Sequence, residues 1–508
     1  MNVTSLMRPW FSRRVKVAQG WEHNIEKVQR NELQRIVSQG KKTQWGHING
    51  LGDVDSYEDY IHTVGHPAGY DEFRPWVMRM IDGERDVLWP GVTRNYAQSS
   101  GTSDGKSKYI PITHESFSRM HYRGGSDVVA NYLHLYPDSR IFDGKAFILG
   151  GSFANELSLP HNSNVKVGDL SANLIANINP LAEVVRVPHR DIALMEQWEE
   201  KLPALVKASI KEKNITNISG VPSWFLTVLK EVLKMTGAAT IHDVWPRLEV
   251  FFHGGISFRP YREQYRCITD VSKMRYLETY NASEGFFAVQ NAIDDPSMLL
   301  LLDAGVFYEF IPIDEAESPE PSGIVPAWKV EKGKIYALVI TACNGLWRYK
   351  IGDTVRIESV DPLKITIAGR TRHFINAFGE ELMVDNADRA IATICNRLDC
   401  EISNYTAAPV YAGDRNRGRH QWLVEFNVPP RDINEFAMML DKELQSLNSD
   451  YQAKRQGGIF LDQLSVTVAP AGLFDCWLAS TGKLGGQRKV PRLCNDRRFI
   501  DPMLAMMK

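Results

Sequence analysis

Apolar residues along the chain form helix-like repeats and strand-like runs. Between residues 22 and 40 they recur every three or four positions, and Gly40 closes the segment, which predicts an amphipathic helix. Helical patterns also lie at 191–213 and 223–235, whereas the segment from Gly40 to about residue 90 looks rich in loops. Dense apolar runs predict strands at 145–150, 248–252, 298–302, 306–311 and 335–342. Strands that alternate with helices predict an α/β fold with substantial sheets.

The pattern changes after Arg370. A short strand leads into GRTRHFINAFGEE, and helix, strand, helix and strand patterns follow at 386–398, 421–426, 431–447 and 464–468. We therefore predict a large N-terminal domain over residues 1–370, a hinge over 371–378 and a C-terminal domain over 379–508. A segment of about 130 residues is long enough to fold as an independent domain.

Composition narrows the class of protein. The 508 residues carry 59 Lys+Arg and 61 Asp+Glu, so the net charge of −2 argues against a nucleic-acid-binding protein. No apolar run approaches the roughly 20 residues of a membrane-spanning helix, and the N-terminus has no signal-peptide core. The 6 cysteines form no C-x-x-C pair, which disfavours a zinc site or a disulfide framework. We expect a cytoplasmic protein without nucleic-acid or membrane partners, either a monomer or a weak homodimer.

The segment from Ser99 to Pro111, SSGTSDGKSKYIP, has the composition of a triphosphate-binding loop. Hydroxyl groups can donate hydrogen bonds to phosphate oxygens, glycines let backbone N–H groups approach closely, and lysines supply positive charge. The alternative is a surface loop of glycine and serine with solvated lysines. The candidate phosphate ligands are Ser99, Ser100, Gly101, Thr102, Ser103, Lys106 and Lys108.

The spacing in this loop differs from that of a Walker loop. A Walker loop places four residues between its glycines and then opens a helix. Here only 3 residues separate Gly101 from Gly105, and the following KYIPIT is strand-like and contains Pro111. The sequence therefore predicts a different kind of triphosphate loop, with a strand on its C-terminal side.

Two later segments offer further ligands for a nucleotide. In YNASEG (280–285), Glu284 is suited to hold Mg²⁺, which binds one or two carboxylates together with phosphate oxygens, and Tyr280 is suited to stack on adenine. In LWRYKIGDTV (346–355), Asp353 is suited to accept hydrogen bonds from ribose hydroxyls. Taken singly, each segment is better explained without a nucleotide, the first as a strand end with a turn and the second as a hairpin turn with a solvated aspartate.

Taken in this order, the three segments and the small C-terminal domain resemble the adenylate-forming superfamily of luciferases, acyl-CoA synthetases and peptide-synthetase adenylation domains. The closer similarity is to the Gretchen Hagen (auxin-responsive-promoter) family of acyl acid amido synthetases, and it extends over essentially the whole chain. The motifs that carry it are SSGTSDGKSKYIP, VPSWF, NASEGFF, GLWRYKIGD and QRKVPRL. The resemblance implies a large N-terminal adenylate-forming domain of β-sheets flanked by helices and a small mobile α/β C-terminal domain.

The resemblance also implies an activity and roles for matched residues. Such an enzyme uses ATP and Mg²⁺ to convert a small carboxylic acid into its acyl-adenylate, releases pyrophosphate, and passes the acyl group to the amine of an amino acid. The implied nucleotide ligands are Ser99, Ser100, Thr102, Ser103, Tyr280, Ser283, Glu284 and Asp353. Arg370 would begin the hinge, and Lys489 would be the mobile catalytic lysine of the C-terminal domain.

Several points stay open at this stage. TGK at Lys483 resembles the catalytic lysine motif of acyl-CoA synthetases, whereas QRKVPR at Lys489 resembles that of the amido synthetases, and we favour Lys489. The hinge sequence is closer to the wider superfamily than to plant amido synthetases, which favours a non-plant member. An acyl-CoA ligase and a nucleotide-binding protein without turnover are the alternative functions. By their place in the resemblance, the expected walls of the acyl pocket are Gly150–Phe153, Leu170–Asn173, Val221–Trp224 and Phe252–Gly255, and ordinary core packing is the alternative for each residue in them.

Overall fold

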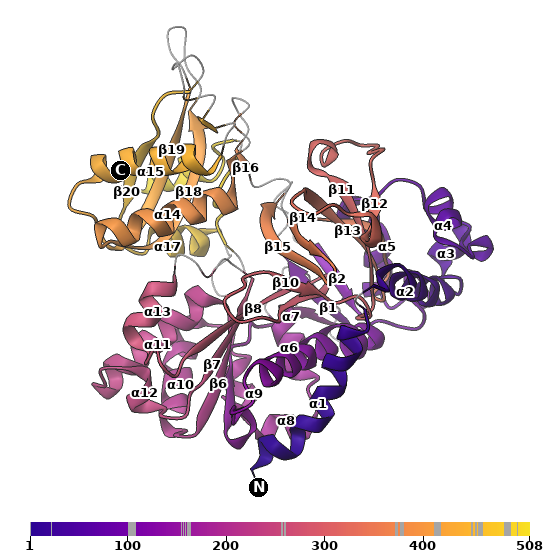
Figure 1. Cartoon of the computed structure of the whole chain (residues 1–508), viewed down its shortest axis with the longest axis horizontal. Helices are drawn as coiled ribbons and strands as arrows, with labels where there is room; N and C mark the ends of the chain where they lie inside the picture. Colours follow the sequence, from indigo (N-terminus) through magenta and orange to yellow (C-terminus); the bar gives the residue numbers. More distant parts are fainter. Residues whose placement is uncertain are drawn as a thin grey trace. The chain divides into compact units, whose positions relative to one another are not determined.

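The computed structural model contains two compact units (Figure 1), which are considered separately below. The first unit consists of Met1–Ile256, Arg266–Thr366 and Gly485–Gln487, and the second of Ser257–Tyr265, Ile367–Leu484 and Arg488–Lys508. The structure describes the whole chain except residues 1, 22, 100–107, 154, 156, 158, 160–163, 256–257, 259–260, 371–373, 376–379, 381, 411–417, 449–450, 453–454, 456–460, 482–488, 495 and 508.

Within the described residues, 12 strands form one mixed sheet, in the order β12-β11-β13-β14-β15-β10-β9-β8-β7-β6-β3-β5. The run from β5 to β8 is parallel, and the pairs β8–β9, β9–β10, β10–β15, β13–β14, β11–β13 and β11–β12 are antiparallel. The bounds are β3 Lys145–Ile148, β5 Arg186–Val187, β6 Ile215–Gly220, β7 Val250–Gly254, β8 Arg275–Ala282, β9 Gly285–Gln290, β10 Met298–Leu300, β11 Val306–Pro312, β12 Val325–Pro326, β13 Ile335–Ala342, β14 Leu346–Val360 and β15 Leu363–Arg370.

The parallel half of this sheet is covered by helices, because its strands are apolar on both faces. Phe225 of the helix α11 packs between Phe147 of β3 and Phe251 of β7, with ring centroids 5.0 and 5.5 Å away. The helix α10 lies against α11 in Figure 1, and Trp245 donates to the Ser209 carbonyl of α10 at 3.1 Å. The carboxyl ends of β3, β6, β7 and β8 consequently point to one edge of the sheet.

The other helices of the chain's first 270 residues surround this core. Their bounds are α1 Val3–Gln19, α2 Ile25–Gly40, α3 Gln44–Ile48, α4 Tyr57–Val64, α5 Tyr70–Ile81, α6 Tyr122–Leu135, α7 Leu170–Ala176, α8 Pro180–Val184, α9 Arg190–Ala193, α10 Trp198–Lys211, α11 Pro222–Thr236, α12 Ile241–Val244 and α13 Arg262–Ile268. The predicted loop-rich character of residues 41–90 is wrong, because α3, α4 and α5 lie there. The helix predicted over 191–213 is interrupted, and forms α9 and α10.

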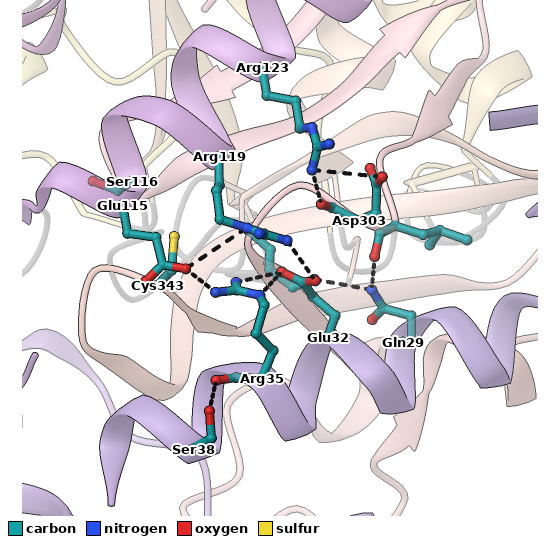
Figure 2. A network of polar contacts seen from close by, with 12 residues as sticks. Gln29, Glu32, Arg35, Ser38, Glu115, Ser116, Arg119, Arg123, Asp303 and Cys343 are labelled. Carbon is teal, nitrogen blue, oxygen red and sulfur yellow. Dashed lines mark hydrogen bonds and ion pairs between the residues drawn. The ribbon is translucent and has the colours of Figure 1, made fainter. Parts of the chain in front are cut away.

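A π-helix, η2 (Ser116–His121), runs directly into α6 and is fastened to α2 by ion pairs (Figure 2). Arg35 of α2 lies between its own neighbour Glu32, at 2.6 Å, and Glu115, at the start of η2. Arg119 of η2 lies 3.8 Å from both carboxylates. Because these groups are only partly exposed, they are less screened by solvent than a surface pair and hold η2 in place.

The second unit is a smaller α/β layer structure. Its sheet has the order β18-β19-β20, with β18 Glu401–Val410, β19 Arg419–Val428 and β20 Ser465–Ala469. Alternate residues face opposite sides of a strand: Trp422 and Val424 pack with α14 (Val384–Leu398) and α15 (Ile433–Leu447), whereas Leu423 packs with α17 (Leu473–Ser480) and α18 (Ile500–Met506). A two-stranded ladder pairs β16 (Phe374–Ile375) with β17 (Leu382–Met383).

The α/β fold class with a large and a small domain is confirmed, and so are the strands predicted from dense apolar runs, which form β3, β7, β10, β11 and β13. The helix predicted from residue 22 forms α2. The division of the chain at residue 370 stays a prediction, because most of the expected hinge over 371–378 lies outside the described residues.

Candidate functional site

The expected phosphate loop connects two antiparallel strands, β1 (Asn95–Ser99) and β2 (Lys108–Ile112). The last pair in their register joins the backbones of Ser99 and Lys108, and β4 (Lys166–Gly168) pairs with β1 on the other side. The loop is therefore followed by a strand, as predicted, and this excludes a Walker loop, which opens a helix. The expected ligands that lie outside the described residues are Ser100, Gly101, Thr102, Ser103 and Lys106.

The strand that leaves this loop is held by a tyrosine of α5. The Tyr70 hydroxyl donates to the Tyr109 carbonyl at 3.1 Å and accepts from the Tyr109 N–H at 2.7 Å. Burial raises the pKa of Tyr70 to about 12, and the negative charge of Glu284 contributes in the same direction. Lys108 extends its ammonium to within 3.3 Å of the Tyr349 hydroxyl of β14.

The YNASEG segment lies at the end of β8 and in the tight turn to β9. Ser283 and Glu284 occupy the turn and are buried, with 8% and 5% of their surfaces exposed. The Glu284 carbonyl accepts a hydrogen bond from Asn344 Nδ2 at 3.0 Å.

A hydrogen bond joins the YNASEG segment (280–285) to the LWRYKIGDTV segment (346–355). The Tyr280 hydroxyl of β8 donates to Asp353 Oδ2 of β14 at 2.6 Å. These strands are four places apart in the sheet order, which corresponds to about 19 Å in a flat sheet. The sheet must therefore curve strongly between them. The Tyr280 ring is buried and packs edge-on against Phe287 at 4.9 Å.

Asp353 sits in an irregularity of a continuous strand. Between the pairs Ala337–Thr354 and Val339–Lys350, β14 has two more residues than β13, and Gly352 takes a φ of 90° there. Such a bulge re-aims a side chain and requires a residue that tolerates positive φ. The interpretation of this segment as a hairpin turn with a solvated aspartate is wrong, because Asp353 is only 6% exposed.

Three of the four expected acyl-pocket segments follow the carboxyl ends of neighbouring parallel strands. Gly150–Phe153 follows β3, Val221–Trp224 follows β6, and Phe252–Gly255 includes the end of β7. The segment of Glu284 follows β8, the next strand of the sheet. In open α/β sheets, ligands bind at this edge of the strands. The fold thus brings three expected acyl segments and the segment of Glu284 to one edge.

The glycine loop after β3 is fixed by three side chains. Ser171 Oγ accepts from the Gly151 N–H at 2.9 Å, and Asp169 Oδ2 accepts from the Ser152 N–H at 2.8 Å. Lys201 donates to the carbonyls of Gly150 and Gly151 at 2.7 and 3.1 Å. Burial lowers the pKa of Lys201 to about 8. These contacts also join the fourth expected segment, Leu170–Asn173, to the glycine loop.

In the second unit, Lys489 is exposed and precedes an anchored segment. Ala407 of β18 donates to the Arg492 carbonyl at 2.8 Å and accepts from the Cys494 N–H at 3.0 Å, and Arg492 pairs with Asp388 at 2.8 Å. The backbone of residues 492 to 494, shortly after Lys489, is thus tied to β18. Arg370 is the last residue of β15, and Lys483 lies outside the described residues.

The described residues contain no cluster of three or more acidic, histidine or cysteine side chains able to enclose a metal ion. Mg²⁺ needs no such cluster, because it binds nucleotides through one or two carboxylates, phosphate oxygens and water. The buried carboxylate of Glu284 fits that requirement. No helix in the described part of the chain is long and apolar enough to cross a membrane.

Three residues that contact this site were missed in the sequence. Asn344 could have been found, because the Asn-Gly dipeptide at 344–345 is a strong hairpin signal and here joins β13 to β14. Tyr70 and Lys201 carry no local signal. Their hydrogen bonds reach segments 39 and 51 residues away.

Comparisons with known proteins define the family. Residues 16–274, 299–370 and 385–498 match the GH3 family N-terminal, central and C-terminal domains. The indole-3-acetic acid-amido synthetase GH3.17 of Arabidopsis thaliana is 22% identical over 94% of this chain and 92% of its own length. The jasmonoyl–L-amino acid synthetase GH3.5 of Oryza sativa subsp. japonica is 23% identical over 65% of this chain and 68% of its own length.

The solved structures agree in fold. The acyl acid amido synthetase AtGH3.15, in complex with 2,4-DB, superposes with a TM-score of 0.77 at 17% identity, covering 97% of this chain and 95% of its own. A 2-hydroxyisobutyryl-CoA ligase in its postadenylation state gives a TM-score of 0.60 at 12% identity, covering 94% and 91%. The chain belongs to the GH3 family of acyl acid amido synthetases, which are adenylate-forming ligases.

Proposed function

We propose that this protein activates a small carboxylic acid with ATP and transfers the acyl group to the amine of an amino acid. The observation that carries the proposal is the hydrogen bond between Tyr280 and Asp353, which joins two expected nucleotide motifs that lie 73 residues apart in the chain. Family membership supports adenylate formation. The position of the Glu284 segment at the same sheet edge as three expected acyl segments supports a shared site for acid and ATP.

The first step would form one bond and break one. A carboxylate oxygen of the acid attacks the α-phosphorus of ATP, the bond to the β-phosphate oxygen breaks, and pyrophosphate leaves. Attack brings two anions together, so the enzyme must supply positive charge and fixed donors. Lys106 and Lys108 would supply charge at the phosphates, Asp353 would hold the ribose, and Glu284 would hold Mg²⁺, which neutralises phosphate charge when bound.

The second step would consume the mixed anhydride. The nitrogen of the amino acid attacks the acyl carbon, the bond to the phosphate oxygen breaks, AMP leaves, and the nitrogen loses a proton. For the first step, the formation of the adenylate, we propose that Lys489 of the second unit is the catalytic lysine that assists the release of pyrophosphate.

The proposal is tested by acid-dependent release of pyrophosphate from ATP and Mg²⁺, over a panel of aromatic, indolic and short aliphatic acids. We expect release with one class of acid, and a loss on the order of 100-fold in Lys489→Ala but not in Lys483→Ala. An amide with an added amino acid supports the second step, whereas a thioester with CoA favours an acyl-CoA ligase. Nucleotide binding without release from any acid would contradict the proposal.

Removing the Tyr280 hydroxyl should weaken nucleotide binding. Asp353 loses its 2.6 Å donor in Tyr280→Phe, and a buried hydrogen bond of this kind contributes roughly 0.5–1.5 kcal/mol. We expect a rise in the KM for ATP of about 3- to 10-fold, with the KM for the acid unchanged.

Tyr60→Phe is the matched control, because it removes a buried 2.6 Å hydrogen bond between phenol and Thr341 on the same sheet. Both variants should lower the melting temperature, but only Tyr280→Phe should change the KM for ATP. Equal KM values in the two variants would show that Tyr280 has only a structural role.

A further inference from the structure

The carbonyl of Glu284 is held by a side chain from a distant turn. Asn344 donates from Nδ2 to this carbonyl at 3.0 Å, and no surface of Asn344 is exposed. Its Oδ1 has no hydrogen-bond partner among the described residues. Burying an amide whose oxygen has no partner is unfavourable. The burial of Asn344 at this place therefore indicates a role for its Nδ2 hydrogen bond beyond packing.

The turn that carries Asn344 is fixed on both sides. The Cys343 N–H donates to the Gly305 carbonyl at 3.0 Å, in the connection between β10 and β11. Gly345 takes a φ of 89°, and a Cβ at that position would lie 2.7 Å from Leu88 Cβ. Only glycine fits there. Asn344 is therefore presented from a backbone with little freedom to move.

The same turn is tied to the strand that leaves the phosphate loop. Thr113, directly after β2, donates from Oγ1 to the Cys343 carbonyl at 2.8 Å and accepts from the Ser116 N–H of η2 at 3.0 Å. Figure 2 shows Cys343 beside Glu115 and Arg35, in the ion-pair network that fastens η2 to α2. The end of β2 and the turn of Asn344 are consequently held by one set of contacts.

We propose that Asn344 is a positioning residue that fixes Glu284 relative to β2, the strand that follows the expected phosphate loop. The chain of contacts runs from β2 through Thr113 and Cys343 to Asn344, and from there to the Glu284 carbonyl. Glu284 lies in the short turn between β8 and β9. Because the turn is short, fixing the Glu284 carbonyl also restricts the position of the Glu284 carboxylate. This inference rests on the proposed function in one respect, the binding of the magnesium nucleotide by Glu284.

The test compares Asn344→Leu, which keeps the branched shape and the number of heavy atoms but removes the donor, with Glu284→Gln. The first readout is the gain in ATP affinity on addition of Mg²⁺, measured by calorimetry without any acid. Contacts one shell away from a metal typically change affinity or activity by about 10- to 100-fold. We expect Asn344→Leu to reduce this gain on the order of 10-fold, and pyrophosphate release by a similar factor.

The double variant Asn344→Leu/Glu284→Gln separates positioning from stability. If Asn344 acts through Glu284, the second substitution should change Mg²⁺-dependent affinity no further. Asn131→Leu is the matched control, because it removes a buried hydrogen bond from Asn131 Nδ2 to the Asp127 carbonyl within α6. It should lower the melting temperature and leave the Mg²⁺ dependence intact.

Each outcome decides a different question. A wild-type protein that binds no magnesium nucleotide contradicts the proposed function and this inference together. Mg²⁺-dependent binding that falls in Glu284→Gln but is unchanged in Asn344→Leu overturns the inference alone. Equal losses in Asn344→Leu and Asn131→Leu, or additive losses in the double variant, also overturn it, because they indicate general destabilisation.

Discussion

Replacing Arg348 with methionine should lower the free energy of unfolding by about 3–5 kcal/mol, which is the usual effect of removing one partner from a buried ion pair. Arg348 donates to both carboxylate oxygens of Glu309 at 2.8 and 2.9 Å, and the exposed fractions of the two side chains are 5% and 1%. Arg348 also donates to the Gly65 carbonyl. In the variant, Glu309 keeps the Tyr57 hydroxyl, 3.1 Å away, but has no cation.

Urea-induced unfolding of the full chain, followed by tryptophan fluorescence, measures this loss. The double variant Arg348→Met/Glu309→Leu should lose less than Arg348→Met alone, because it leaves no uncompensated buried charge. Arg356→Met removes a partly exposed arginine from the same strand and should stay within about 0.5 kcal/mol of the wild type. A loss under about 1 kcal/mol in Arg348→Met would show that the buried carboxylate of Glu309 is neutralised without Arg348 in the variant.

The position of Arg348 shows what a motif does and does not specify. GLWRYKIGD is similar to a family motif, and the sequence predicts Asp353 within it as a ligand of the ribose. The motif does not reveal that one of its cations is used inside the core, by a carboxylate 39 residues earlier in the chain. Only the pairing of β11 with β13, and of β13 with β14, brings the two side chains together.

Elements governed by local pattern could be predicted from the sequence. The repeat after residue 22 forms α2, and the apolar run from Ile335 forms β13, because period and composition act within a few residues. The helix α4 was missed although Ser56 and Asp59 form a complete capping box, which is a local signal of a helix start.

The candidate site could be predicted as a set of residues, but not as an arrangement. The order of the motifs gave Tyr280, Glu284 and Asp353, yet nothing in the sequence indicates that Tyr280 donates to Asp353 or that Glu284 is held by Asn344. These contacts span 73 and 60 residues and depend on the curvature of the sheet. From sequence alone, the bulge at Asp353 cannot be distinguished from a hairpin turn, because a glycine before an aspartate is compatible with a β-bulge and with a hairpin turn.

A second large effect should appear in the dependence of stability on pH, and it originates in His121. This residue ends η2, is 4% exposed, and neither ring nitrogen has a hydrogen-bond partner among the described residues. Burial lowers its pKa from 6.5 to about 4. A neutral imidazole is therefore built into the core, and protonation opposes folding.

The lowered pKa fixes the sign of the effect. Between pH 4 and 6.5 the unfolded chain binds more protons at this site than the folded chain, so stability rises with pH in that window. The contribution is fully present above pH 6.5 and is lost as the pH falls, by about 2 kcal/mol at pH 5 and about 3 kcal/mol at pH 4.

Unfolding free energies at pH 7.5 and pH 5 measure this contribution when the wild type is compared with His121→Gln, which cannot titrate. We expect the wild type to lose about 2 kcal/mol more than His121→Gln between the two pH values. His134→Gln, at an exposed position in the last turn of the adjoining α6, should follow the wild type. If His121→Gln shows the full wild-type loss, the acid sensitivity belongs to other groups. His121 would then lie in an environment that stabilises its protonated form, because a bound molecule or water forms a hydrogen bond with the imidazole.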